Sequence, residues 1–512
     1  MAQRTSSDGS NPQGTTPVLA RSSGSSRAHS ATRSSSTSAA AQSRPSRSRK
    51  SRPELSPSTF LEQTDKIRPN PNPSIPPRRW VGQVALAVVG LGLGISVGMA
   101  ITVETHSQLV APGGSSIFIS NVTGLVGTYL AMVMVLLVSR IPPVERVLGQ
   151  DGLLRWHRRL GPWPISLLVA HAVFVTIGYA QTARSGIWQQ IGSFMNTYAD
   201  VLAATVGLGL MIMAGIASIG FIRRRVRRET WWIMHLYLYM ALALSFAHVI
   251  ALGPSFVGHP FTQAVWSLVW IATAGMVIAY RIGLPIIRSI RHNLKVVEVV
   301  QEAPGVVSVI CMGRNLERLS VSGGQFFAWR FLTRKYWWQA HPYSISALPK
   351  PPYLRLTIKA VGDHSAAMAN IRPGTRVAIE GPYGAFTRYS QHRSKVVLIA
   401  AGIGITALRS LLEDLPSRSA PTVIVRATNE EDLVFRSEIA ELVRHRKGQL
   451  YERLGPRNKA ILSAQTLRKL VPDILQRDLY VCGPEEFVSD IVTVAHRLGI
   501  PREAVHHEAF SY

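Results

Sequence analysis

Six long apolar stretches constrain the fold of this chain more than any other feature. Each holds close to the ~20 apolar residues that an α-helix needs to cross a bilayer. They lie at residues 80–101, 117–138, 160–180, 201–222, 233–252 and 264–284. The composition agrees, since 46% of the 512 residues are hydrophobic and only 17% are charged. The sequence therefore predicts an integral membrane protein whose helices contact the lipid bilayer.

The loops between these stretches predict their orientation. Residues 139–161, 223–229 and 281–293 are heavily basic, whereas Arg184 is the only Lys or Arg in the opposite loops. By the positive-inside rule both termini are cytoplasmic, and we expect the membrane to be the plasma membrane. The net charge of +27 does not indicate nucleic-acid binding, because the basic residues concentrate in a tail and in short loops rather than on one soluble face.

The tail and the cysteines carry little chemistry. Residues 1–79 are rich in Ser, Arg, Ala, Thr and Pro and are predicted to be a disordered basic tail. They lack the order of charge, apolar core and cleavage site that marks a signal peptide. Cys311 and Cys482 lie far apart in soluble sequence, so we expect no disulfide framework, no cysteine metal site and no iron–sulfur cluster.

Four histidines stand in or beside the third and fifth apolar stretches. An ionisable side chain inside a bilayer is costly and indicates function, and imidazole is the usual axial ligand of haem iron. With both helices running outward, His157 and His235 lie near the cytoplasmic face, and His171 and His248 lie deeper. We therefore predict two stacked b-type haems, the inner one between His157 and His235 and the outer one between His171 and His248.

The spacing between the two histidines of each apolar stretch supports this prediction better for the third stretch than for the fifth. The 14 residues between His157 and His171 span about 21 Å and return to almost the same helix face. The 13 residues between His235 and His248 turn the side chains apart, so a bulge or a tilt is expected there. The alternative, that these histidines cap helix ends or bond to neighbouring carbonyls, is strongest for His157, which could lie in the membrane interface.

After Asn293 the pattern becomes that of soluble strands. The runs LKVVEVVQE, VVSVICMG and YLRLTIKAVG alternate apolar and polar residues and predict a small antiparallel barrel. Residues 395–415 then predict a buried strand, a glycine turn and a helix, and later core strands indicate a parallel sheet. Gly402 and Gly404 would let the backbone approach a pyrophosphate, although so short a motif is also typical of a plain turn.

Six motifs together carry a family resemblance. They are HPYSIS (341–346), IKAVGDHS (358–365), GPYGAFT (381–387), AGIGITA (401–407), CGP (482–484) and the closing EAFSY. Their order is similar to that in flavoprotein reductases of the ferredoxin reductase superfamily. With the four membrane histidines, residues 80–512 resemble the ferric reductase and NADPH oxidase family. The resemblance implies a six-helix haem-binding domain (80–290), an FAD-binding β-barrel domain (291–390) and an α/β, Rossmann-like NAD(P)H-binding domain (391–512).

The resemblance also implies the cofactor-binding residues. Those expected at FAD, with Ser344 near the reactive N5, are His341, Pro342, Tyr343, Ser344, Lys359, Gly362, His364 and Ser365. Those expected at the nicotinamide dinucleotide are Gly381, Pro382, Gly384, Gly402, Gly404, Thr406, Cys482, Gly483 and Pro484. Tyr512, or Phe510 in its place, would cover the isoalloxazine ring. No side chain needs to act as a catalytic acid or base.

The implied activity is transmembrane electron transfer. Electrons would pass from cytoplasmic NAD(P)H through FAD and two haems to an acceptor on the outer face, either O2, giving superoxide, or a ferric chelate. Arg426 and Arg436 follow the strand that typically meets the adenosine ribose, which favours NADPH over NADH, unless both are plain surface charges. The alternatives are an electron-delivery subunit that reduces a quinone or an external redox protein, and a haem-free transporter fused to a flavin reductase.

Overall fold

A computed structural model of the chain describes residues 56, 58–59, 70, 72–76, 78, 80–456 and 462–510. The predicted disordered tail therefore lies almost entirely outside the described residues, and so does Tyr512. The chain divides into a unit of residues 1–54 and a unit of residues 55–512. All elements described below belong to the second unit.

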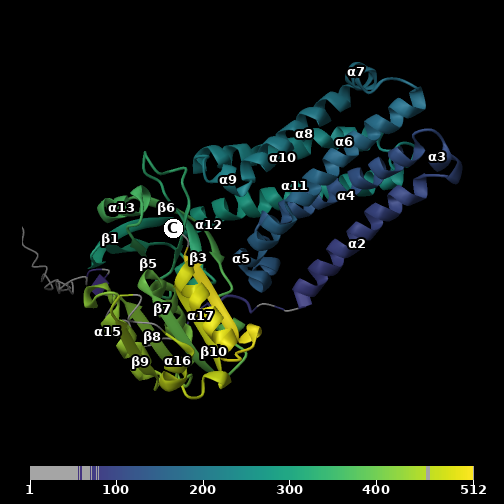
Figure 1. The fold of residues 1–512 in the computed structure, drawn as a ribbon. Helices are drawn as coiled ribbons and strands as arrows, with labels where there is room; N and C mark the ends of the chain where they lie inside the picture. Colours follow the sequence, from purple (N-terminus) through teal and green to yellow (C-terminus); the bar gives the residue numbers. More distant parts are fainter. Residues whose placement is uncertain are drawn as a thin grey trace, which may run out of the picture. The chain divides into compact units, whose positions relative to one another are not determined.

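Six helices are long and apolar enough to cross a membrane, and each overlaps one predicted stretch. They are Trp80–Val103, Gly114–Val138, Gly152–Ala183, Asp200–Ser218, Glu229–Leu252 and Pro260–His292. The corresponding elements in Figure 1 are α2 (Trp80–Val103), α4 (Gly114–Val138), α5 (Pro142–Leu160), α6 (Pro162–Ala183), α8 (Ala199–Ser218), α10 (Arg228–Leu252) and α11 (Pro260–Val277). The prediction of six spans in an integral membrane protein is confirmed.

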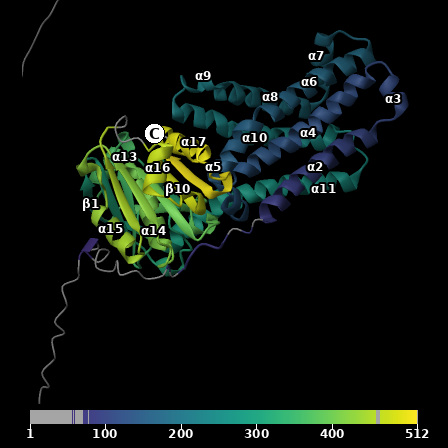
Figure 2. The same cartoon turned by 60° about the horizontal axis from the view of Figure 1, so that its bottom comes forward.

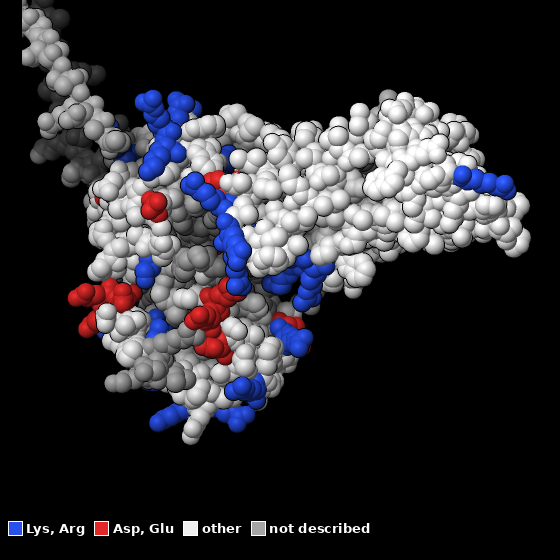
Figure 3. Space-filling model, turned by 45° about the horizontal axis from the view of Figure 1, so that its top comes forward, with Lys and Arg blue, Asp and Glu red and all other residues white. Residues whose placement is uncertain are grey.

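The helices bury small and aromatic side chains among themselves and leave apolar side chains outside. α4 packs along α6, and α8 packs along α10. Met132, Ala241 and Phe256 are buried in the shared core, whereas Leu86 and Ile271 are exposed. Figure 3 shows a face on which the helical part carries almost no charged side chains, while Lys, Arg, Asp and Glu gather over the sheets. A lipid environment covers such an apolar surface.

The last span continues beyond its apolar part without a break. α11 passes through a π-helical segment, Ile278–Gly283, into α12 (Leu284–His292), and together they form one helix of 33 residues. Asn293 ends this helix with a left-handed φ of 41°, and the first strand begins at Leu294. The final helix therefore leads directly into the first sheet.

The first sheet is antiparallel, as predicted. Its strands are β1 (Leu294–Ala303), β2 (Val306–Met312), β3 (Phe326–Phe331), β4 (His341–Ser344), β5 (Tyr353–Lys359) and β6 (Arg376–Tyr383), in the order β4-β3-β6-β1-β2-β5. Trp329, Phe327 and Val309 are fully buried in its core. The two edge strands are not joined by a ladder, but an isolated bridge between Ile345, just after β4, and Leu356 links the end of β4 to the middle of β5.

The second sheet is parallel and covered on both faces. Its strands are β7 (Lys395–Ala401), β8 (Thr422–Ala427), β9 (Gln449–Leu454), β10 (Arg477–Pro484) and β11 (Val505–Phe510), in the order β11-β10-β7-β8-β9. Its main helices are α14 (Ile405–Asp414), α15 (Arg436–His445), α16 (Ala464–Leu470) and α17 (Glu485–Arg497) (Figure 2). One apolar cluster holds α14 and α15, and another holds α16 and α17. The predicted fold class is confirmed.

Candidate functional site

The helices bring the four membrane histidines together in the two predicted pairs. His157 lies in the last turn of α5 and His171 lies in α6, whereas His235 and His248 both lie on α10. The ring centroids of His157 and His235 are 6.0 Å apart, and those of His171 and His248 are 6.3 Å apart. α10 is α-helical throughout, so it contains no bulge that would correct the 13-residue spacing.

The ring spacings fit two imidazoles on one metal ion. A metal–imidazole bond is about 2.0–2.1 Å, and a ring centroid lies about 1.1 Å behind the ligating nitrogen, so the two centroids on one ion lie about 6.2–6.4 Å apart. The ring planes cross at 65° and 70°, so neither pair is stacked. Each pair therefore leaves room for an iron atom between its rings.

Hydrogen bonds orient the first histidine of each pair. Nδ1 of His157 lies 3.1 Å from the carbonyl oxygen of Met134, and Nδ1 of His171 lies 2.9 Å from that of Ser120. A ring that donates from Nδ1 keeps Nε2 available as a ligand. Hydrogen bonds to carbonyl groups are also expected if these histidines have only a structural role. However, they occupy only one nitrogen of each ring.

The histidines on α10 are held by packing instead. Among the described residues, Nδ1 of His235 and Nδ1 of His248 are buried without a hydrogen-bond partner. The indole of Trp231 stacks on His235, with ring centroids 4.9 Å apart. His171 of α6, in contrast, is approached closely by α4, since a Cβ at Gly124 would lie 2.6 Å from Nδ1 of His171. Glycine at this position therefore lets α4 approach the ring.

The residues predicted to bind FAD gather around strand β4. The rings of His341 and His364 are stacked with centroids 3.7 Å apart, and Oη of Tyr343 lies 3.2 Å from Nδ1 of His364. Burial, together with the proximity of His341, lowers the pKa of His364 to about 4. This ring is therefore neutral at physiological pH. Oγ of Ser365 accepts hydrogen bonds from the backbone N–H groups of Val361 and Gly362 and so fixes the turn before α13 (Asp363–Ala367).

Two buried polar atoms in this cluster point to a ligand. Within the described part of the chain, Oγ of Ser344 and Nε2 of His364 are buried and make no hydrogen bond. Leaving such groups unsatisfied costs about 1–3 kcal/mol each. The polar edge and the phosphates of a flavin nucleotide would supply the missing partners, so the chemistry of these residues is compatible with FAD. Lys359 is exposed at the end of β5.

The turns predicted to hold the nicotinamide dinucleotide meet at the carboxyl ends of β7 and β10. Gly402 begins the turn after β7 with a φ of +54°, and Thr406 lies in the first turn of α14. A Cβ at Gly404 would lie 2.4 Å from the carbonyl oxygen of Cys482, so this turn touches the Cys482–Pro484 turn directly. Phe510 pairs with Pro484. Cys482 is fully buried, and this burial raises the pKa of its thiol, so the thiol is not a reactive group.

The segment Gly381–Gly384, also predicted to contact the dinucleotide, comprises the last three residues of β6 and the residue that follows. Its N–H at Gly384 donates to Glu145 of α5 over 2.9 Å, and the carbonyl oxygen of Gly381 accepts a hydrogen bond from Arg288 of α12. Among the described residues no hydrogen bond joins this segment to the 402–406 turn. These two hydrogen bonds join the segment to α5 and α12.

The two arginines predicted near the adenosine ribose lie differently. Arg426 pairs in register with Ala401, immediately before the Gly402 turn, and Nη2 of Arg426 lies 3.3 Å from the carbonyl oxygen of Gly455. Arg436 forms ion pairs with Glu430 and Glu452 at the surface. Arg426 is therefore the better placed of the two to meet a 2′-phosphate.

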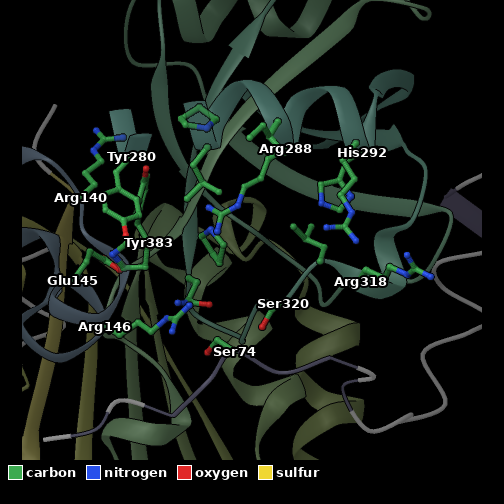
Figure 4. Close-up of a pocket in the computed structure, with 18 residues that line it drawn as sticks. Ser74, Arg140, Glu145, Arg146, Tyr280, Arg288, His292, Arg318, Ser320 and Tyr383 are labelled. Carbon is green, nitrogen blue, oxygen red and sulfur yellow. The ribbon is translucent and has the colours of Figure 1, made fainter. Parts of the chain in front are cut away.

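A basic cavity where α5, α12 and β6 meet was not predicted from the sequence. It has a volume of about 260 Å³ (Figure 4). Its arginines are Arg140, Arg146, Arg288, Arg291 and Arg318. These cations can hold an anionic group. The basic loops predicted only orientation, because nothing in the sequence shows that residues so far apart line one space.

Glu145 lines this cavity among these cations, and Glu380 forms an ion pair with Arg140. Glu145 is buried, and burial raises the pKa of its carboxyl group from 4.5 to about 7, against the opposing effects of the Gly384 N–H and of Arg140, Arg146 and Arg288. Because the folded protein binds this proton more tightly than the unfolded chain, its contribution is fully present below pH 4.5 and is lost as the pH rises through about 7. The shift corresponds to roughly 3 kcal/mol.

We expect Glu145→Gln to flatten the pH dependence of stability. The amide keeps the shape of the carboxyl group but does not ionise, so the variant should lose less stability than the wild-type protein between pH 6 and pH 8. Thermal unfolding of the full chain at both pH values measures this difference. Glu441→Gln, at an exposed carboxyl group, is the control. Equal pH dependence in the wild-type protein and Glu145→Gln would contradict the argument.

Family models match both halves of this arrangement. A model described as ferric reductase like transmembrane component matches residues 123–246, and a model described as FAD-binding domain matches residues 292–387. The first range contains His157, His171 and His235 and ends two residues before His248. The second contains β4, the 359–365 turn and Gly381–Gly384.

Curated relatives cover the soluble part. The reductase subunit of glycine betaine monooxygenase from Chromohalobacter salexigens is 24% identical over 43% of this chain and 64% of the relative. The flavohemoprotein of Bacillus subtilis is 27% identical over 33% of this chain and 46% of the relative. Ferredoxin–NADP reductase B of Sorangium cellulosum is 28% identical over 33% of this chain and 77% of the relative. The chain thus spans about half to two thirds of the first two relatives.

Solved structures give only a distant likeness. Flavohemoglobin from Malassezia yamatoensis has a TM-score of 0.40 at 17% identity and covers 77% of this chain and 96% of that chain. The FAD/NAD-binding domain of nitric oxide dioxygenase from Vibrio cholerae has a TM-score of 0.34 at 21% identity and covers 43% of this chain and 99% of that chain. At these scores the likeness carries no functional inference. The two family models thus place a ferric reductase like transmembrane component and an FAD-binding domain side by side in one chain.

Proposed function

We propose that this protein is a transmembrane oxidoreductase that passes electrons from cytoplasmic NAD(P)H through FAD and two b-type haems to an acceptor on the outer face. The observation that carries the proposal is the pair of imidazole spacings, 6.0 Å and 6.3 Å, on the same two spans. Two sites of this kind on a pair of helices suit a relay of one-electron carriers. A haem-free transporter gives no reason for four intramembrane histidines.

The chain supplies orientation and ligation rather than acid–base chemistry. His157 and His235 would hold the inner haem, and His171 and His248 the outer one. Ser344, Tyr343 and His364 would hold the flavin, and the Gly402–Thr406 and Cys482–Pro484 turns the dinucleotide. When bound, the flavin accepts two electrons as hydride and releases them singly, and the haems carry one electron at a time. The apolar helices exclude water around the histidines.

NADPH is the proposed donor, with NADH as the weaker substrate. Arg426 lies next to the Gly402 turn, where its guanidinium group can pair with a 2′-phosphate. Arg436 would first have to break its ion pairs with Glu430 and Glu452 before it could contact a 2′-phosphate. The basic loops support cytoplasmic termini and therefore a cytoplasmic site of NADPH oxidation.

O2, giving superoxide, is the proposed acceptor, with ferric chelates second. Ferric chelates are anionic and are best attracted by a basic external surface. Arg184 is the only Lys or Arg in the predicted outer loops, so this face offers such chelates little attraction. Reduction of a quinone or of an external redox protein is the remaining alternative.

An anaerobic reduction experiment tests the proposal. The purified full chain in lipid nanodiscs should show a Soret band that shifts on addition of NADPH, and NADH should act more slowly. O2, ferric citrate, a soluble quinone and a redox protein are then admitted in turn, and the fastest reoxidant is the acceptor. Absence of a Soret band in protein that retains flavin would refute the haem relay. Reoxidation by O2 no faster than by the others would refute the choice of acceptor.

A further inference from the structure

A cluster of two histidines and one aspartate lies at the edge of the parallel sheet, away from every site described above. Asp478 is the second residue of β10, His506 is the second residue of β11, and His392 precedes β7. All three therefore stand at the amino-terminal ends of parallel strands. The glycine turns at Gly402 and Gly483 stand at the carboxyl ends, so the cluster is on the opposite edge from the dinucleotide turns.

The ligand atoms of the cluster converge. Oδ1 of Asp478 lies 3.2 Å from Nε2 of His506 and 3.9 Å from Nδ1 of His392, and all the ligand atoms lie within 4.8 Å of one another. Ligand atoms of a tetrahedral zinc ion, with bonds of about 2.0–2.2 Å, stand about 3.3–3.6 Å apart. The imidazole of His392 is exposed and can rotate to shorten the longer distances.

The aspartate is positioned as a ligand by the backbone. Its side chain is fully buried, and its Oδ2 accepts the N–H groups of His392 and Arg393 over 2.8 Å and 2.5 Å. Oδ1 is thereby aimed at both imidazoles. Although burial alone would raise the pKa of Asp478, the hydrogen bonds from His506 and from these two N–H groups hold that pKa below its usual value.

Other groups around the cluster leave the metal position open. The ring of Tyr480 packs against His506 with centroids 4.5 Å apart, but its hydroxyl group donates to the carbonyl oxygen of Thr387. Lys395 and Arg477, the nearest basic residues on β7 and β10, are paired with Asp473. The imidazoles of His392 and His506 are parallel, with an angle of 5° between their planes.

We propose that His392, Asp478 and His506 bind a divalent transition metal, with Zn²⁺ as the best fit, and that water completes the coordination. Two imidazoles and one carboxylate form a three-ligand set of the type that binds zinc with one open position, whereas Mg²⁺ prefers six oxygen ligands. The metal joins the segment before β7 to β11, the strand that ends at Phe510. It therefore fixes the carboxyl-terminal strand to the start of the nucleotide-binding sheet.

Metal retention by the full chain tests this site. Chelator-treated protein in nanodiscs is incubated with one equivalent of Zn²⁺, desalted, and assayed for zinc and haem iron by mass spectrometry. The wild-type protein should retain about one zinc per chain and gain thermal stability on zinc addition. His392→Ala and His506→Ala should bind zinc at least ~10-fold more weakly and lose the thermal shift, because each removes a direct ligand. X-ray absorption at the zinc edge should report only nitrogen and oxygen ligands.

The controls separate this site from other histidines. His496→Ala removes an exposed imidazole of α17 and should bind zinc like the wild-type protein, and Mg²⁺ should give no thermal shift. His392 lies in an exposed segment, so its replacement should leave the haem and flavin spectra unchanged and shows that the variant is folded. Equal zinc retention in the wild-type protein and His392→Ala, or no retention by the wild-type protein, would overturn the proposal.

Discussion

Replacement of His248 by alanine is expected to remove the outer haem and to stop electron transfer to the outer face. The ring of His248 stands 6.3 Å from that of His171, and no other imidazole of the described spans pairs with His171. Changes to groups that merely support a metal ligand cost about 10–100-fold in affinity, so loss of a ligand itself should cost ~100-fold or more. The variant should therefore lose about half of its haem.

The measurement compares three readouts in the full chain: haem per flavin, reduction of an acceptor outside sealed vesicles, and reduction of a soluble dye by the cytoplasmic flavin. His248→Ala should lower the first by about half and the second by ~100-fold, with the third within about twofold of the wild-type rate. His106→Ala, at an exposed histidine of the short helix α3 (His106–Val110), is the matched control. Full haem content in His248→Ala would refute the proposed ligation.

Gly404→Ala is expected to weaken the binding of NADPH while sparing the membrane part. A Cβ at this position would lie 2.4 Å from the carbonyl oxygen of Cys482 and 2.7 Å from the backbone nitrogen of Gly483. Both neighbours are backbone atoms, so the two turns must move apart. Overpacking of this kind typically costs about 1–3 kcal/mol, which corresponds to roughly a 5- to 150-fold weaker interaction if it falls on binding.

Anaerobic flavin reduction at a series of NADPH concentrations measures this effect. The variant should require at least ~5-fold more NADPH for the same rate, while its flavin and haem spectra stay those of the wild-type protein. Gly209→Ala on α8 is the control, because a Cβ there meets no atom within 4 Å. If half-saturation in Gly404→Ala stays within about twofold of the wild-type value, the contact between these turns does not govern dinucleotide binding.

The membrane part was predictable because the thickness of the bilayer sets the number of apolar residues in a membrane-spanning helix. The predicted stretch 80–101 corresponds to the span Trp80–Val103, and 233–252 to Glu229–Leu252. The ends of the helices were predicted less well where a helix continues into a basic segment. Residues 139–161 were interpreted as a basic loop, yet α5 begins at Pro142, because helices there need no apolar run once they leave the lipid.

The sites differ in how far the sequence could reveal them. The histidine pairs were predictable because a helix relates depth to residue number, and the dinucleotide turns because glycine patterns are local. The basic cavity and the His392, Asp478 and His506 cluster were not, since their members come together only through strand register. Asp478 meets His506 because β10 and β11 are parallel neighbours, and no local pattern specifies that pairing.

The continuous final helix sets a mechanical condition on the protein. Its 33 residues extend about 50 Å, while the hydrocarbon core is about 30 Å thick. About 20 Å of this helix therefore exceeds the thickness of the hydrocarbon core. The helix ends at His292, and only Asn293 separates it from β1. An added or deleted residue in this helix would rotate the attached sheet by about 100° around the helix axis. The number of residues in this helix therefore determines the rotational orientation of the first sheet about the helix axis.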